Sequence, residues 1–355
     1  MSNNKIDIDL LSEVCKIPGA PGFEQRIREK IIQEVTPFVD EVKVDAMGSV
    51  HAIKRGKGSE NKKVLIAAHM DEISFIVTHI DDDGYIRFHP LGGFDPKTLT
   101  AQRVFVHGSE DVLGVMGTKP IHVMKPEERK KMPALSDFYI DTGMKKEEVE
   151  KLVSIGNPIT RERDLVVMGP CINSKSLDNR VSVYILIETL REMSKQQLDV
   201  DIYGVFTVQE EVGLRGAMTA ASGIDPDFGI NLDVTLACDY PMAQPHERIT
   251  SLGDGTAIKV LDGATICDYR MVRYMKELAE KNKISYQMEI LPAGGTDTAG
   301  IQRYAKGGSI AGGISIPTRY LHQSIEMANM DDVRATIDLL KASLEGISSY
   351  DWSFS

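Results

Sequence analysis

Two adjacent carboxylates, Glu210 and Glu211, stand at the end of an apolar run in the stretch DIYGVFTVQEEVGLRGA. The run is typical of a buried strand, whose successive side chains point to opposite faces. Taken alone, such a pair is typical of a solvated turn, because ionised carboxylates are seldom buried without a partner. The pair acquires a chemical meaning only if other charged or imidazole side chains converge on the same end of the sheet.

Other residues of metal-binding type follow other predicted strands. KVLIAAHMDE delivers His69 and Asp71, FGINLDV delivers Asp233, and GGISIPTRYLHQS delivers His322 in the following loop. Asp178, in SKSLDNR, stands just before a predicted helix. Each has an ordinary explanation when taken alone, such as a core histidine, a helix N-cap or a turn residue. In an open α/β sheet, however, the carboxyl ends of the strands form one crevice.

Imidazole and carboxylate groups without a thiolate suit Zn²⁺, Co²⁺ or Mn²⁺. The candidate ligands are His69, Asp178, Glu211, Asp233 and His322. They exceed the needs of one ion, so we predict two divalent ions that share a bridging carboxylate. Such a pair lowers the pKa of a bound water from about 15.7 toward ~7. Glu210, where the strand frays into a turn, is then placed to act as the general base.

The elements that must position these residues fall into two textures. Residues 1–72 and 171–355 alternate helices with apolar strands, which predicts an α/β domain with a central mixed sheet flanked by helices, the domain that would carry the catalytic residues. Residues 73–170 hold short alternating strands separated by turns, which predicts a small inserted β-barrel. The first helix is expected over 23–35, after the turn-rich PGAPG, with its apolar positions recurring every four residues.

Further elements are expected at defined ranges. The insertion is predicted to contain strands at 73–80, 85–91, 103–108, 112–118 and 165–170, with a helix at 144–153. In the catalytic domain, strands are predicted at 63–68, 201–208, 227–234, 285–291 and 308–316, and helices at 179–193, 269–282 and 330–347.

Composition restricts the partners. The net charge of -11 opposes nucleic-acid binding, and the basic stretch KPEERKKMP at 125–133 is interrupted by acids and prolines, so we expect a solvated loop. No segment has the ~18 apolar residues of a membrane span, and the start lacks the features of a signal peptide, so a cytoplasmic protein is expected. The cysteines lack Cys-x-x-Cys spacing and are expected to be free thiols, mostly buried: Cys15, Cys171, Cys238 and Cys267.

The motifs AAHMDE, SKSLDNR, QEEVGLRGA, NLDV, GGTDTAG and SIPTRYLHQS occur in the order found in the M42 family of dinuclear metallo-aminopeptidases. The chain resembles this family, which includes the TET and glutamyl aminopeptidases, from end to end. The resemblance implies a phosphopeptidase-like α/β catalytic domain, a β-barrel dimerisation domain and short peptides as substrates. It also implies a homo-oligomer in which dimers assemble into a dodecamer.

The resemblance further implies how the ligands divide between two metal ions, Zn²⁺ or Co²⁺. His69 and Asp233 resemble ligands of one ion. Glu211 and His322 resemble ligands of the other ion. Asp178 resembles the carboxylate that bridges the two ions.

The remaining motif residues resemble groups around the metals. Glu210 resembles the general base, and Asp71 resembles the carboxylate that holds a ligating imidazole. Thr296 and Asp297, in GGTDTAG, resemble residues that line the substrate cleft.

Two positions depart from the family pattern. Asn179 stands where many relatives have a second acid, and Thr298 stands where an alanine is common. Neither is a predicted ligand, so we expect activity to persist.

Three rival functions remain to be weighed. Glycoside hydrolysis also uses two carboxylates, but aromatic residues are only 6% and Trp352 is the single tryptophan, which leaves little for sugar stacking. A metal-binding shell protein without turnover would need ligands but no base such as Glu210. Nucleotide binding is disfavoured because GDGT and AGGTDTAG lack the Gly-x-x-x-x-Gly-Lys pattern.

The stretch ILPAGGTD offers no basic residue, which favours a neutral or broad preference for the N-terminal residue.

Overall fold

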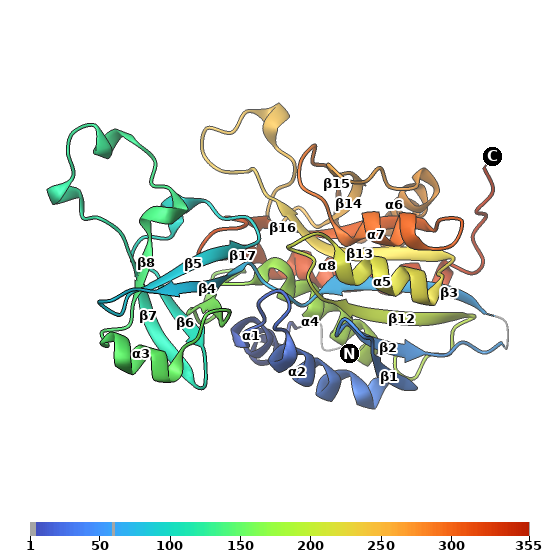
Figure 1. Ribbon diagram of the computed structural model, residues 1–355. Coiled ribbons are helices and arrows are strands. Elements are labelled where there is room, and N and C mark those ends of the chain that lie inside the picture. Colours follow the sequence, from blue (N-terminus) through green and yellow to red (C-terminus); the bar gives the residue numbers. More distant parts are fainter. Residues whose placement is uncertain (1–4, 59–60, 355) are drawn as a thin grey trace.

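The computed structural model describes residues 5–58 and 61–354 and arranges them as a large mixed β-sheet covered by helices, joined to a closed β-barrel (Figure 1). The helices are α1 (Ile8–Lys16), α2 (Gln25–Val35), α3 (Lys146–Leu152), α4 (Leu177–Glu192), α5 (Arg215–Ile224), α6 (Tyr269–Asn282), α7 (Asp297–Tyr304) and α8 (Met330–Gly346). The predicted α/β fold with an inserted barrel is therefore confirmed.

The strands of the large sheet are β1 (Glu41–Val44), β2 (Val50–Lys54), β3 (Lys62–His69), β10 (Val166–Met168), β11 (Cys171–Ser174), β12 (Val200–Thr207), β13 (Phe228–Leu236), β14 (Thr256–Leu261), β15 (Tyr286–Ile290), β16 (Ile310–Arg319) and β17 (Glu326–Asn329). Their order is β1-β2-β12-β3-β13-β16-β17-β11-β10, and β14 pairs with β15 and β16. The neighbours β12, β3, β13 and β16 are mutually parallel. Their carboxyl ends therefore lie at one edge of the sheet.

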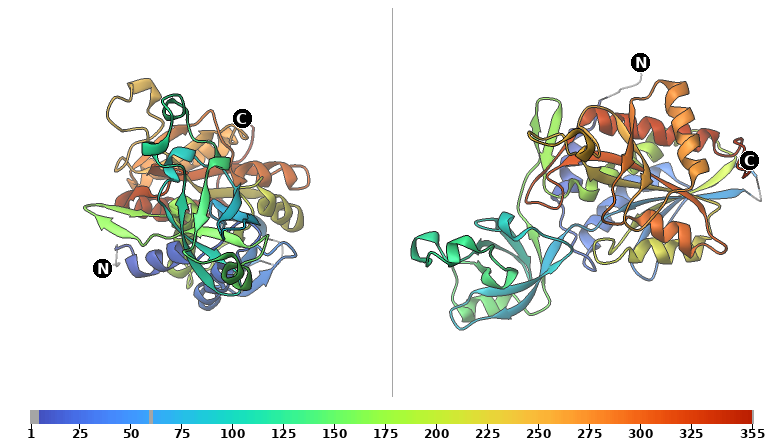
Figure 2. Two further views of the ribbon diagram at one scale, coloured as in Figure 1. Left: turned by 60° about the vertical axis from the view of Figure 1, so that its left-hand side comes forward. Right: turned by 90° about the horizontal axis from the view of Figure 1, so that it is seen from above.

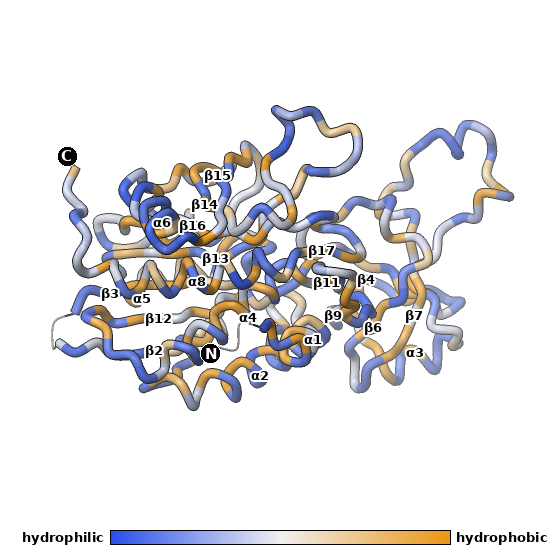
Figure 3. Tube along the Cα trace, turned by 180° about the vertical axis from the view of Figure 1, so that it is seen from behind, coloured by the Kyte–Doolittle hydropathy of each residue, from blue (hydrophilic) through white to orange (hydrophobic). Residues whose placement is uncertain are grey.

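Helices cover both faces of this sheet. On one face α4 packs on β3 and β13, with α1, α2 and α8 around it; on the other α5 and α7 pack together against the same strands. The continuous apolar run of β3 follows from this arrangement, because Val64 and Ile66 enter the core of the α4 face while Leu65 and Ala67 enter the core of the α5 face. Figure 3 shows the resulting concentration of hydrophobic residues along the central strands.

The barrel is built from β4 (Ser74–Ile80), β5 (Ile86–Leu91), β6 (Arg103–His107), β7 (Asp111–Gly117), β8 (Tyr139–Asp141) and β9 (Pro158–Arg161). Phe75, Val77, Ile140 and Ile159 belong to its separate apolar core. Figure 2 shows the barrel set to one side of the sheet domain. Arg26 of α2 reaches Asp111 of β7 with two hydrogen bonds of 2.6 and 2.8 Å, which tie the two units together.

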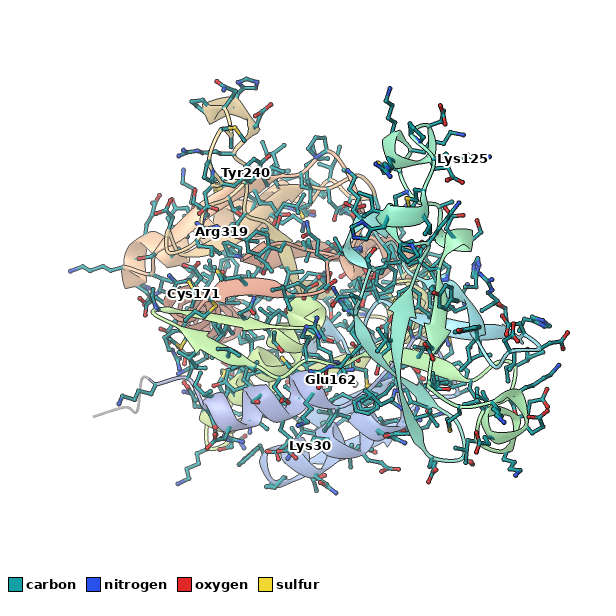
Figure 4. All side chains as sticks on the ribbon, turned by 90° about the vertical axis from the view of Figure 1, so that its left-hand side faces the viewer. Lys30, Lys125, Glu162, Cys171, Tyr240 and Arg319 are labelled. Carbon is teal, nitrogen blue, oxygen red and sulfur yellow. The ribbon has the colours of Figure 1, made fainter. Side chains whose placement is uncertain are left out.

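Two long loops project from the same side of the molecule. Residues 118–138 connect β7 to β8, and residues 237–255 connect β13 to β14; Figure 4 labels Lys125 and Tyr240 on these loops. The basic stretch at 125–133 is mostly exposed, which confirms the predicted solvated loop.

Three expectations need correction or refinement. The strand expected at 165–170 is β10, and it pairs with β11 in the large sheet instead of joining the barrel. A helix, α1, precedes the one that was expected to be first. All four cysteines are free, as expected, but only Cys15 and Cys267 are buried. Among the described helices, none has the length and hydropathy needed to cross a membrane.

Candidate metal centre

The predicted site residues meet at the carboxyl edge of the four parallel strands. His69 is the last residue of β3, and Asp233 lies near the end of β13. Glu210 and Glu211 follow β12, and His322 follows β16. The carboxyl ends of neighbouring parallel strands border one crevice, which explains why residues from such distant segments converge here.

The carboxylate of Asp178 lies between the two imidazole rings. Its Oδ1 is 3.1 Å from Nε2 of His69, and its Oδ2 is 3.2 Å from Nε2 of His322. Asp178 belongs to the first turn of α4, where its backbone is not helical, and its N–H donates to the buried Glu326 carboxylate at 2.9 Å. One oxygen therefore faces each ring, which is the arrangement that a bridging carboxylate requires.

Each ring also faces a second carboxylate. Oδ1 of Asp233 is 3.8 Å from Nε2 of His69, and Oε2 of Glu211 is 3.7 Å from Nε2 of His322. Oε2 of Glu210 is also 3.8 Å from Nε2 of His69. Donor atoms of His69, Glu210 and Asp233 lie within 4.8 Å of one another. Glu210, the expected general base, is therefore also close enough to contact an ion held by the other two residues.

Hydrogen bonds at the other ring nitrogens orient both imidazoles. Nδ1 of His69 lies 3.1 Å from the backbone oxygen of Asp71, and Nδ1 of His322 lies 3.1 Å from the backbone oxygen of Gly93. These contacts favour a proton on Nδ1 and leave Nε2 free to bind a cation. The side chain of Asp71 makes separate contacts: its carboxylate accepts the N–H groups of Glu210 and Glu211, each at 3.1 Å.

The charge state of the site fits divalent cations. Burial raises the pKa of Glu211 to about 8, and the neighbouring charge of Asp178 adds to this. Burial likewise raises the pKa of Asp233 to about 7, against the opposing effect of His69. Oε1 of Glu211 is buried and has no hydrogen-bond partner among the described residues. Bound cations would stabilise these crowded, buried carboxylates and would give the unpartnered oxygen of Glu211 a contact.

A buried ionic network beneath the site escaped the sequence analysis. Nζ of Lys175 lies 2.8 Å from both oxygens of Glu72, and the Ser176 hydroxyl donates to the same carboxylate at 2.5 Å. Nε of Arg180 donates to the backbone oxygen of Met70 at 2.8 Å. The network joins the end of β3 to the start of α4, and so fixes the ligands that these two segments carry. Its members stand inside the motifs HMDE and SKSLDNR, which was the available signal.

A cavity of about 100 Å³ opens beside the ligands. It is lined by residues of the centre and of the 291–296 turn, and Thr296 forms part of its wall. Asp297 lies deeper, where it accepts a hydrogen bond of 2.5 Å from the Thr207 hydroxyl at the end of β12. The two residues that were expected in the substrate cleft therefore stand at different depths.

Comparison with known proteins decides the family. The model of the M42 family, described as M42 glutamyl aminopeptidase, matches residues 48–339. The chain belongs to the M42 peptidase family. A protein of Acetivibrio thermocellus that is assigned to the aminopeptidases is 44% identical over 94% of this chain and 96% of its own length. The lysyl aminopeptidase of Pyrococcus furiosus is 34% identical over 98% and 99%.

Solved structures of other peptidases share the fold. An aminopeptidase from the archaeon Desulfurococcus kamchatkensis superimposes with a TM-score of 0.90 at 37% identity, covering 95% of this chain and 94% of its own. The TET1 peptidase of Pyrococcus horikoshii, with a TM-score of 0.86 at 32% identity over 95% and 98%, can assemble into a tetrahedron or a large octahedral shell. The predicted family and class of enzyme, an M42 aminopeptidase, are thereby confirmed.

Proposed function

We propose that this M42 enzyme is a metal-dependent aminopeptidase that hydrolyses N-terminal residues from short peptides at a dinuclear centre. The observation that carries the proposal is the Asp178 carboxylate, which presents one oxygen to Nε2 of His69 and the other to Nε2 of His322. Asp233 on one side and Glu211 on the other complete two sets of donors around it.

The donor chemistry supports two divalent ions, Zn²⁺ or Co²⁺, with Mn²⁺ also compatible. His69 and Asp233 would hold one ion, Glu211 and His322 the other, and Asp178 would bridge them. Ions bound in this way supply Lewis acidity and an acidified water.

Glu210 acts as the general base in this proposal. Burial raises its pKa well above the usual range; the His69 ring opposes this, and the charge of Asp233 adds to it. A carboxylate with a raised pKa takes a proton from the attacking water and returns it to the leaving amine. The Asp71 carboxylate holds the backbone N–H of Glu210, and this contact positions the base.

The test of this role is Glu210→Gln, which keeps the shape of the side chain and removes its basicity. We expect a loss of about 10³-fold or more in kcat on aminoacyl p-nitroanilides, with two metal ions per subunit retained. Glu150→Gln, an exposed position on α3, is the matched control. Loss of metal in Glu210→Gln would make Glu210 a ligand, and near-normal turnover would contradict the proposed base.

Chelator distinguishes this function from glycoside hydrolysis. We expect p-nitroaniline release to stop when metal is removed and to return with Zn²⁺ or Co²⁺, with no cleavage of carboxymethylcellulose. Cellulose cleavage that persists in chelator would overturn the proposal.

We further propose that the protein is cytoplasmic and forms homo-oligomers, in which dimers assemble into a dodecamer. Apolar side chains exposed on the edge strand β10 support an assembly, because Val166, Val167 and Met168 are each about half exposed. The division into a catalytic domain of residues 1–72 and 171–355 and a dimerisation domain within residues 73–170 is part of this proposal, with β10 now counted in the catalytic domain because it pairs with the large sheet. Light scattering after size-exclusion chromatography gives the mass, and a monomer at micromolar concentration would contradict it.

A further inference from the structure

The cavity beside the metal ligands extends to a pair of charged residues that the proposed mechanism does not use. Lys259 of β14 and Asp262, just after it, line this cavity together with Asp233 and Glu210. Lys259 is only 1% exposed. A substrate anchored at the metals would place the side chain of its first residue against this wall.

A buried carboxylate on the neighbouring strand already balances the charge of Lys259. Its Nζ contacts Oε1 of Glu289, which is fully buried on the neighbouring strand β15 and stands directly opposite Lys259 in the strand register. Oδ2 of Asp262 lies 3.7 Å from the same Nζ. One ammonium therefore faces two carboxylates, and it is not free to pair with a substrate carboxylate.

Asp262 is equally occupied. Its Oδ1 accepts the N–H groups of Ala264 at 2.8 Å and Thr265 at 2.7 Å, and its Oδ2 accepts the Thr296 hydroxyl at 2.9 Å. A cationic side chain entering the cavity would meet the like charge of Lys259 and a carboxylate that already accepts three hydrogen bonds. Lys259 and Asp262 therefore offer no free partner to a substrate side chain of either charge.

The rest of this wall is apolar or small: Val234, Leu291, Ala293, Gly294, Gly295 and Leu321. Family membership leaves the preference open, because the family model is described as a glutamyl aminopeptidase and a relative is named a lysyl aminopeptidase. We propose that Glu289 sets the specificity of this subsite by holding Lys259 in a neutralised ion pair, so that the enzyme prefers uncharged aliphatic N-terminal residues. The inference rests on the proposed aminopeptidase function.

The first experiment compares leucyl, glutamyl and lysyl p-nitroanilides with the metal-loaded enzyme. We expect kcat/KM for the leucyl substrate to exceed the other two by about tenfold or more. Calorimetric titration with free L-leucine and L-glutamate gives a readout that needs no turnover, and leucine is expected to bind at least about fivefold more tightly.

Variants of the ion pair test the cause of this preference. Glu289→Gln removes the carboxylate closest to Lys259 and leaves only Asp262, at 3.7 Å, so the glutamyl-to-leucyl ratio of kcat/KM should rise by about fivefold or more. The double variant Lys259→Gln/Glu289→Gln removes both charges and should not raise the ratio. Glu150→Gln, which removes one exposed negative charge on α3, is the control. Thermal unfolding and metal content show that each variant is folded and loaded.

Two results would overturn the inference: equal cleavage of glutamyl and leucyl substrates by the unaltered enzyme, or an unchanged ratio in folded, metal-loaded Glu289→Gln. Failure of the proposed function looks different, because no aminoacyl substrate would then be cleaved at full metal loading. In that case the amino-acid titrations still decide the subsite, and tighter binding of glutamate than of leucine would refute it.

Discussion

Two buried carboxylates hold the turn that carries Glu210 and Glu211. Asp71 accepts the N–H groups of these two residues, and Glu24 accepts the N–H of Gln209 at 3.2 Å. Gln209 has φ 55°, in the left-handed region that costs a non-glycine residue energy, so the turn depends on such contacts. Burial raises the pKa of Glu24 to about 7, and the charge of Asp71 adds to this.

The raised pKa of Glu24 predicts a pH-dependent stability. The folded state binds its proton more tightly than the unfolded state, whose pKa is near 4.5, so the free energy of unfolding falls as pH rises from 4.5 to about 7. Glu24→Gln keeps an acceptor oxygen but cannot ionise. We expect its stability relative to the unaltered protein to improve by roughly 2–3 kcal/mol between pH 5 and pH 8. Urea unfolding at both pH values, with chelator present throughout, measures the difference.

The control for this prediction is Glu29→Gln, which changes an exposed carboxylate on α2, the helix that begins directly after Glu24. It should leave the pH dependence of unfolding as it is. Parallel stability curves for Glu24→Gln and the unaltered protein would show that Glu24 stays ionised in the fold.

Sequence reasoning found the residues at strand ends but missed the buried pairs. His69 and Asp233 could be placed together because parallel strands share one carboxyl edge. Lys259 and Glu289 stand inside the apolar stretches TAIKVL and SYQMEIL, and they become partners only when β14 pairs with β15. Strand pairing depends on the whole sheet, so the sequence alone does not name the partner of either charge.

At the scale of elements, the start of α5 packs against the end of β12. A Cβ on Gly216 would lie 2.6 Å from both the backbone nitrogen and the backbone oxygen of Val208, which real Cβ atoms do not approach. The N–H of Gly216 also donates to the Val208 oxygen at 3.0 Å. The turn at 209–211, which carries Glu210 and Glu211, continues directly from Val208. A shift of α5 would therefore also shift this turn.

Gly216→Ala is therefore expected to displace the turn. We expect a loss of roughly 2–4 kcal/mol in the free energy of unfolding and a fall in kcat of about tenfold or more. Gly223→Ala, on the same helix with open space at its Cβ position, is the matched control and should be neutral or stabilising by about 0.5–1 kcal/mol. Urea unfolding and kcat on a leucyl substrate check both. Equal behaviour of the two variants would show that α5 is not coupled to the turn.

Elements with strong periodicity were predictable, and exposed edge elements were not. The apolar faces of α6 and α8 predict where these helices lie. The continuous apolar run of β3, which is buried on both faces of the sheet, predicts that strand. The three residues of β10 are all exposed, so their pattern holds no information on which sheet they join. The non-helical first turn of α4, at Asp178 and Asn179, likewise follows from its surroundings, not from local propensity.

At the scale of the whole molecule, the inserted unit contacts a residue of the proposed metal centre. The backbone oxygen of Gly93, just after β5, lies 3.1 Å from Nδ1 of His322. The Ser324 hydroxyl donates to the backbone oxygen of Thr98 at 2.7 Å, which holds the His322 loop against the same unit. The sequence indicated an insertion, but contacts between two irregular loops from separate units have no periodic signal. The inserted unit therefore orients a proposed ligand, His322, in addition to any role in assembly.

Ser324→Ala tests this coupling between the two units. Loss of a hydrogen bond worth about 0.5–1.5 kcal/mol should loosen the His322 loop and weaken metal binding by about two- to tenfold, because the ring is then less well oriented. Competition with a fluorescent chelator measures the affinity, and the weaker of two Zn²⁺ steps should change most. Ser349→Ala removes a similar hydroxyl-to-carbonyl bond, of 3.1 Å to Gly346, beyond the end of α8 and serves as the control. If Ser324→Ala binds both ions as tightly as the control does, the Ser324–Thr98 bond does not orient His322, and this coupling between the two units is refuted.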